Sequence, residues 1–112
     1  MSAKKKNSHR LYKCPSFLRD IIKQAILMLD VDRIYLFGSR ARGDASSKSD
    51  YDLAFCFSKT KDESWPLFLA TTQESAKTLL PLDLVNIRKI NKKLKHEIEK
   101  EGRILYQKVT HE

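Results

Sequence analysis

Apolar residues first recur at regular spacing after Pro15, behind a start of the chain that is basic and polar. Pro15 and Ser16 are typical of a helix start, with Ser16 as a candidate N-cap. The apolar stripe that follows has the three- and four-residue spacing of an α-helix. It comprises Phe17, Ile21, Ala25 and Met28. We expect a helix of about 14 residues that ends near Asp30.

Four short apolar runs predict buried strands. They are rich in β-branched and aromatic residues, and turn residues bound them. The runs are residues 33–37, 52–57, 82–87 and 104–106. A short helix is expected from Ser39 to about Arg42, directly after the first run.

Two further helices separate the later strands. Ser64 and Pro66 begin the first of them, and Pro81 stops it. Its inner stripe is Trp65, Leu69, Thr72, Ala76, Leu79 and Leu80. Asn91 is the expected cap of the second helix, and Gly102 is expected to end it as a left-handed C′ residue.

This order of elements indicates an α/β (α+β) fold, in which helices pack on a mixed β-sheet of about four strands. The periodicity does not fix the order of the strands in the sheet. A chain of 112 residues has the length of one domain. We assign residues 1–13 to a basic N-terminal tail and residues 14–112 to the folded domain.

The positive charge is concentrated in two segments. The formal net charge is +8, and residues 1–13 and 88–95 each carry five basic residues and no acid, so the remainder is close to neutral. Such patches suit an acidic or phosphate-bearing partner, and they suit a solubilising tail and a solvated helix face equally well. The second segment lacks interleaved aromatic residues, so direct nucleic-acid binding stays open.

Cysteine content and hydropathy bear on the compartment. Cys14 and Cys56 are the only cysteines; two do not make a disulfide framework, which favours the reducing cytoplasm. No apolar segment follows the basic start, and no stretch approaches the roughly 18 apolar residues of a membrane span. We therefore expect neither a signal peptide nor a membrane partner.

The first candidate functional residues are the aspartates at the start of the second predicted strand. Asp50 and Asp52 are two positions apart, so their side chains point the same way, while Tyr51 between them points to the core. Two adjacent carboxylates repel each other, and Mg²⁺ relieves that repulsion because it prefers oxygen ligands. Asp83 opens another strand in the same pattern. Three converging acids would suffice for two metal ions about 4 Å apart and an in-line phosphoryl displacement.

The Gly38-Ser39 turn is suited to bind the phosphates in such a reaction. Glycine lets the backbone approach a phosphate without a Cβ in the way, and the Ser39 hydroxyl adds a hydrogen-bonding group. Arg40, Arg42 and Lys48 are candidates to neutralise a triphosphate, although the sequence does not show which of them faces inward.

These residues carry a resemblance to a known family. The stretch FGSRARGDASSKSDYDL, residues 37–53, resembles the signature of the polymerase-β-type nucleotidyltransferase superfamily. The short chain and the ending IEKEGRILY are similar to its minimal nucleotidyltransferase (MNT) branch. The resemblance covers about residues 16–108 and implies the polymerase-β-type nucleotidyltransferase fold.

The resemblance also implies roles for individual residues. Gly38 and Ser39 would bind a nucleoside triphosphate, ATP or another, and we place Arg40, Arg42 and Ser49 at the same nucleotide site. Two Mg²⁺ ions would be held by three catalytic carboxylates. These are Asp50, Asp52 and Asp83.

Members of the MNT branch commonly pair with a helical HEPN toxin and act as its antitoxin. The resemblance therefore favours an enzyme that transfers AMP from ATP to a hydroxyl of such a partner protein. Two alternatives stay open. One is a non-catalytic binding module that neutralises its partner by forming a complex. The other is a nucleotidyltransferase that acts on a small molecule or on RNA.

Overall fold

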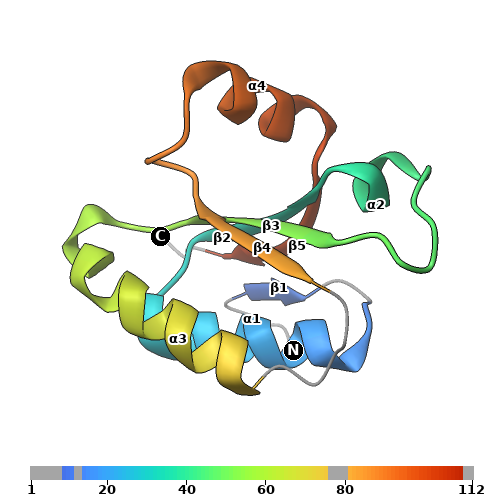
Figure 1. Cartoon of the computed structure of the whole chain (residues 1–112). Helices are drawn as coiled ribbons and strands as arrows, with labels where there is room; N and C mark the ends of the chain where they lie inside the picture. Colours follow the sequence, from blue (N-terminus) through green and yellow to red (C-terminus); the bar gives the residue numbers. More distant parts are fainter. Residues whose placement is uncertain (1–8, 12–13, 76–80, 110–112) are drawn as a thin grey trace, which may run out of the picture.

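The protein is built on a five-stranded mixed sheet in this computed structural model, which describes residues 9–11, 14–75 and 81–109. The order across the sheet is β1-β5-β2-β3-β4 (Figure 1). β3 and β4 are parallel, and the other neighbouring pairs are antiparallel. The strands are β1 (His9–Leu11), β2 (Arg33–Phe37), β3 (Tyr51–Cys56), β4 (Leu82–Asn86) and β5 (Arg103–Lys108).

Helices cover both faces of the sheet. Figure 1 shows α1 (Ser16–Leu29) and α3 (Trp65–Ser75) on one face and α4 (Lys92–Glu101) on the other. The short α2 (Ser39–Arg42) follows β2, and the 3₁₀ helix η2 (Lys59–Ser64) leads into α3. None of the helices among the described residues has the length and apolar character that crossing a membrane requires.

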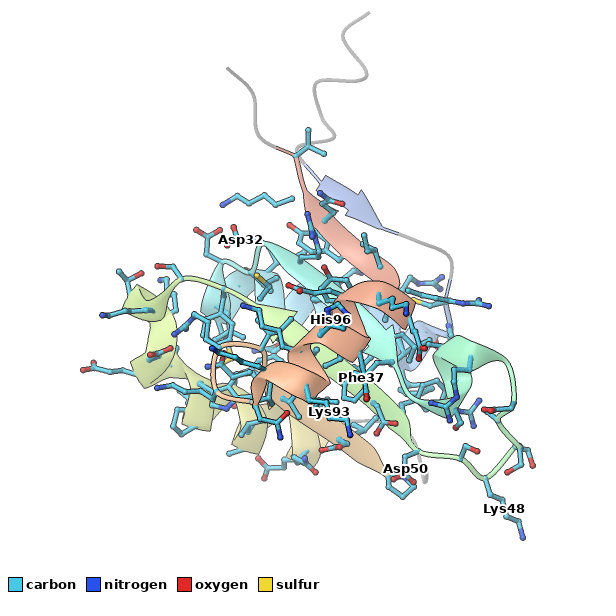
Figure 2. The ribbon with its side chains drawn as sticks, turned by 90° about the horizontal axis from the view of Figure 1, so that it is seen from above. Asp32, Phe37, Lys48, Asp50, Lys93 and His96 are labelled. Carbon is cyan, nitrogen blue, oxygen red and sulfur yellow. The ribbon has the colours of Figure 1, made fainter. Side chains whose placement is uncertain are left out.

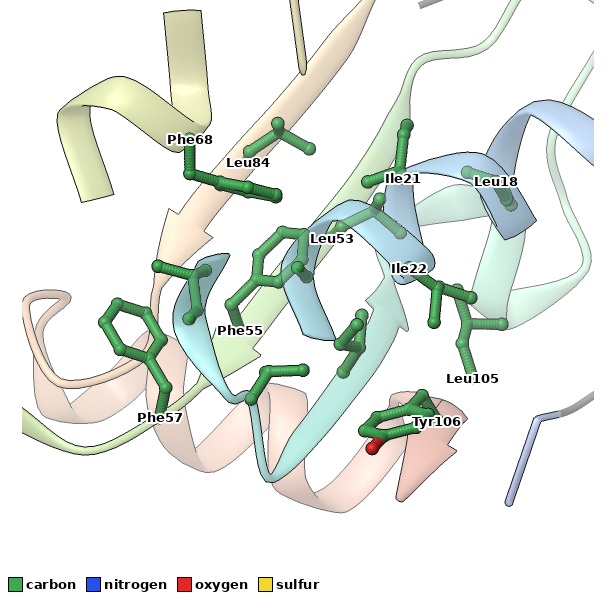
Figure 3. Close-up of a cluster of buried hydrophobic side chains, with 14 of the residues drawn as sticks. Leu18, Ile21, Ile22, Leu53, Phe55, Phe57, Phe68, Leu84, Leu105 and Tyr106 are labelled. Atoms are coloured by element: carbon green, nitrogen blue, oxygen red, sulfur yellow. The ribbon is translucent and has the colours of Figure 1, made fainter. Parts of the chain in front are cut away.

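Alternation along β3 divides the core into two parts. Leu53 and Phe55 are fully buried on the face that α1 and α3 cover (Figure 3). Ala54 points the other way and shares a smaller buried cluster with Tyr35 and with Ile98 of α4. Because both faces of β3 are covered, its middle is apolar throughout, and polar residues are confined to its ends.

Most elements lie where the sequence predicts them. β2 has the predicted bounds, α1 has 14 residues, and the Asn91 side chain caps α4 by accepting a hydrogen bond from Leu94 N at 2.8 Å. α3 begins at Trp65 as expected; residues 76–80 of the predicted helix, with Ala76, Leu79 and Leu80, lie outside the described residues.

A fifth strand, β1, lies within the segment expected to be a basic tail. It pairs with β5 along the edge of the sheet, with Arg10 opposite Gln107. Three residues carry no detectable alternation, so the apolar pattern could not reveal this strand. The sheet is mixed, as predicted, and the four predicted strands form β2 to β5.

The ends of two helices differ from the sequence prediction. Pro15 occupies the N-cap position of α1, in extended conformation, and Ser16 is the first helical residue. Gly102 ends α4, but its φ of −71° is not left-handed. Glycine is needed there for space instead, because a Cβ would lie 2.5 Å from the carbonyl oxygen of Ile98 and 3.2 Å from the Tyr35 ring.

We expect Gly102→Ala to lower the free energy of unfolding by about 2–3 kcal/mol, since backbone oxygens leave the added methyl group no room. Gly43→Ala is the matched control. Its surroundings are open, and only its φ of 89° opposes a side chain, at a cost of about 1 kcal/mol. Urea denaturation measures both. Equal losses in the two variants would show that the corner at Gly102 is not tightly packed.

Candidate active site

Gly38 follows β2 and turns the chain into α2. Its φ of 75° and ψ of −157° lie where L side chains are rare. A Cβ at this position would overlap the Asp52 carboxylate, which lies directly against the glycine. Position 38 therefore requires glycine for two reasons: its backbone conformation, and the space that a carboxylate already occupies.

Strand register places Asp52 and Asp83 side by side. Asp52 is paired with Phe37 of antiparallel β2 and with Asp83 of parallel β4, and neighbouring strands lie about 4.8 Å apart. Paired side chains point to the same face of a sheet. That face is the one α4 covers, because Ala54, two residues after Asp52, shares a buried cluster with Ile98.

Asp50 adds a third carboxylate from the loop before β3, at the edge of the molecule (Figure 2). Asp50 and Asp83 are exposed, whereas Asp52 is partly buried. Burial raises the pKa of Asp52 above its ordinary value, and the charges of Asp83 and Asp50 raise it further, against the opposing effect of Arg42. The three carboxylates thus share one neighbourhood, and ionising Asp52 there costs free energy.

The donor set suits a hard cation that receives further ligands from elsewhere. Mg²⁺ is usually held by one or two carboxylates together with waters and substrate phosphates. Across the described ranges, no three or more His, Cys, Asp or Glu side chains are arranged so that they could hold an ion by themselves. The expectation that the three aspartates would suffice by themselves is therefore not met, and a metal there would need ligands from water or from a phosphate-bearing substrate.

Arg40 holds the loop that carries Asp50. Its guanidinium nitrogens donate hydrogen bonds of 3.1–3.3 Å to three backbone carbonyl oxygens of that loop. The acceptors are Ser46, Ser47 and Ser49. The guanidinium carbon also lies 4.0 Å from the centroid of the Tyr51 ring, which is buried on the opposite face from Asp52, as predicted. Arg40, expected at the nucleotide site, is thus engaged with its own loop.

The other residues that were predicted to bind the nucleotide or its phosphates differ in their surroundings. Ser39 is partly buried at the start of α2. Arg42 is exposed, pairs with Asp44 at 3.3 Å and is the cation that acts on Asp52. The Ser49 hydroxyl accepts a 2.9 Å hydrogen bond from a backbone N–H of its own loop. Lys48 points away from the body of the molecule (Figure 2).

A small pocket, which we call the α2–α4 pocket, lies beside this group. Its volume is about 210 Å³, and Gly38, Arg42, Glu97 and Glu101 contribute to its lining. Sequence reasoning missed the two glutamates. The available signal was their spacing of four residues, which places both on one side of α4 next to its apolar stripe.

The similarity of this chain to known proteins agrees with the fold described above. A family model described as "Polymerase beta, Nucleotidyltransferase" matches residues 16–111. A toxin–antitoxin structure with AMP-PNP is similar at 26% identity and a TM-score of 0.56, over 80% of this chain and 72% of that one. No curated protein sequence matches the chain.

Two further solved structures share the fold. A minimal nucleotidyltransferase is 21% identical with a TM-score of 0.60, over 76% of this chain and 85% of that one. The toxin–antitoxin MntA-HepT is 20% identical with a TM-score of 0.60, over 82% of this chain and 71% of that one. The predicted nucleotidyltransferase fold is thereby confirmed.

The family match includes every element that builds the site. It begins with α1 and extends beyond β5, and it contains the turn at Gly38 and all three aspartates. The chain therefore belongs to the polymerase beta nucleotidyltransferase family.

Proposed function

We propose that this nucleotidyltransferase uses Mg²⁺ and ATP, or another nucleoside triphosphate, to transfer a nucleoside monophosphate to a hydroxyl of a partner protein in the cytoplasm. The observation that carries the chemistry is the placement of Asp52 beside Asp83 on neighbouring strands, with the Asp52 carboxylate against Gly38. A partner protein is favoured because the solved structure at 26% identity is a toxin–antitoxin with AMP-PNP. As partner we propose a HEPN-type helical toxin, with this chain as its antitoxin.

The three aspartates would hold the metal. Asp50 and Asp52 approach from β3 and the loop before it, and Asp83 approaches from β4. Bound Mg²⁺ would stabilise the negative charge that builds up on the phosphates during an in-line displacement. The Asp83 carboxylate, which is exposed, would accept the proton of the attacking hydroxyl. Attack forms a bond from that oxygen to the α-phosphorus. The bond from the α-phosphorus to the oxygen that bridges to the β-phosphate breaks, and pyrophosphate leaves.

The turn at Gly38 would receive the phosphates. No side chain stands between its backbone and the Asp52 carboxylate, so a phosphate could approach both. The Ser39 hydroxyl directly follows this turn, and Arg42 lines the pocket beside Gly38, whereas Arg40 is engaged with its own loop. Since Asp50 and Asp83 are exposed, the reaction centre is open to an acceptor as large as a protein.

We expect the double substitution Asp50→Asn with Asp52→Asn to reduce label transfer from [α-³²P]ATP to a co-purified helical partner by at least about 100-fold. Without the bound metal, the transition state loses several kcal/mol of charge stabilisation. The assay uses the complex of the two proteins, resolved on a denaturing gel. Asp44→Asn, an exposed acid of the same loop, is the matched control and should label normally.

Unchanged labelling in the double variant would refute the metal mechanism. A cell-growth assay with the same variant separates the enzyme from a binding module. An enzyme that silences its partner by modification loses protection with the two carboxylates. A protein that acts only by forming a complex still protects the cell.

We expect Asp52→Asn to raise the melting temperature by a few degrees in metal-free buffer at neutral pH. The raised pKa of Asp52 means that its neutral form favours the folded state and its ionised form opposes it. Differential scanning calorimetry should show this gain shrinking as the pH falls through the raised pKa of Asp52 and vanishing below the ordinary aspartate pKa of about 3.9. Asp44→Asn again serves as control. A lower melting temperature for Asp52→Asn would contradict the electrostatic description of the site.

We expect Arg40→Lys to destabilise the loop rather than to abolish nucleotide binding. Lysine keeps the charge but cannot reach three carbonyl oxygens with one planar group. The expected loss is about 1–2 kcal/mol, with faster amide hydrogen exchange confined to residues 43–50. Arg42→Lys is the control and should leave exchange in the loop unchanged. Slow exchange in Arg40→Lys together with lost nucleotide affinity would assign Arg40 to the nucleotide instead.

A further inference from the structure

The α2–α4 pocket shares Gly38 with the carboxylate group. Gly38 lines the pocket and also touches the Asp52 carboxylate. Both features lie on the face of the sheet that α4 covers, because Phe37 and Ile98 of the pocket belong to the buried cluster of that face. A molecule in the pocket would therefore lie directly next to the proposed phosphate position.

The lining of the pocket combines an apolar floor with hydrogen-bond acceptors. Glu97 and Glu101 stand one helical turn apart on α4 and are exposed. Among the described residues, neither forms an ion pair. Carboxylates accept hydrogen bonds and repel phosphates. The apolar part of the lining is Phe37, Ala41, Leu94 and Ile98.

The size of the pocket limits what it can hold. Its volume of about 210 Å³ is below the roughly 300–1,000 Å³ of pockets that enclose a whole drug-sized ligand. A flat ring system with N–H donors on its edge fits both the volume and the chemistry. The charged triphosphate suits the pocket less well, since two glutamates and only one cation of the described part of the chain, Arg42, line the space.

A second pocket, larger in volume, lies mainly on the opposite face of the sheet. It has a volume of about 620 Å³ and is lined by Tyr51 and Leu18, which belong to the core under α1. Tyr51 and Asp52 are neighbours in β3 and point to opposite faces. A nucleotide seated there would have the sheet between its phosphates and the carboxylates.

We propose that the α2–α4 pocket is the nucleoside subsite and selects a base that carries an exocyclic amino group, adenine above all. The base lies on the apolar floor, and Glu97 and Glu101 accept hydrogen bonds from its amino group. The phosphates run past Gly38 toward Asp52. This inference rests on the proposed nucleotidyltransferase function and names the part of the substrate that the site selects.

The test compares ATP with inosine triphosphate, in which a carbonyl oxygen replaces the 6-amino group. Calorimetric titration of the full chain in Mg²⁺ should show ATP binding at least about 5-fold more tightly, since a carbonyl facing carboxylates leaves polar groups unpaired. In the double variant Glu97→Gln with Glu101→Gln, the ratio should fall to near one, because glutamine also donates hydrogen bonds.

A matched variant controls for the loss of charge. Glu74→Gln with Glu99→Gln removes the same two charges from exposed positions outside the pocket, and it should keep the wild-type ratio. Equal binding of the two triphosphates by the wild-type protein, or an unchanged ratio in the double variant at 97 and 101, would overturn the subsite and leave the proposed function standing. If neither triphosphate binds the wild-type protein, both proposals fail.

Discussion

The parallel pairing of β3 with β4 is the constraint on which the candidate site depends. It fixes Asp52 opposite Asp83, so two like charges stand on neighbouring strands and on one face of the sheet. Directly opposed like charges destabilise a sheet. Burial and the charges of Asp83 and Asp50 together raise the pKa of Asp52. A fold that keeps such an arrangement gives up stability at the position where a cation and a phosphate would restore it.

The neighbouring elements are shaped around this group of carboxylates. Gly38 leaves room for the Asp52 side chain at the end of β2. Arg40 uses its guanidinium to hold the loop that leads to Asp50. On the far side of β3, apolar packing against α1 and α3 fixes the strand (Figure 3). The polar face can then remain open, because the other face supplies the burial that holds the sheet together.

Sequence reasoning predicted much of this arrangement, and its failures have physical causes. Helix and strand positions followed from periodicity, and the alternation along a strand correctly put Asp52 and Tyr51 on opposite faces. The sequence could not show that β3 and β4 are adjacent in the sheet, since this depends on long-range pairing that no local pattern encodes. The role of Gly102 was misjudged because the crowding, from the Ile98 carbonyl of α4 and from Tyr35 and Leu36 of β2, depends on how the folded chain packs at this corner.

Side-chain partners across a loop were equally beyond the sequence. Arg40, Arg42 and Lys48 looked equivalent as cations. Only the folded loop shows that Arg40 holds carbonyl oxygens, that Arg42 pairs with Asp44 and that Lys48 points to solvent. The glutamates of α4 were overlooked because exposed acids on a helix are ordinary. Their role depends on the pocket that they line together with residues of α2 and the end of β2, and that pocket forms only in the folded chain.

The central claim is that the three aspartates, together with a nucleotide, hold the divalent metal ions. Paramagnetic Mn²⁺ tests it directly, because it broadens the NMR signals of amides close to the ion. In the presence of ATP, substoichiometric Mn²⁺ should selectively broaden the amide signals of Gly38, Asp50, Asp52 and Asp83, and Mg²⁺ should reverse the effect. Broadening at Asp50 and Asp52 that leaves Asp83 sharp, or broadening centred elsewhere on the chain, would contradict the account.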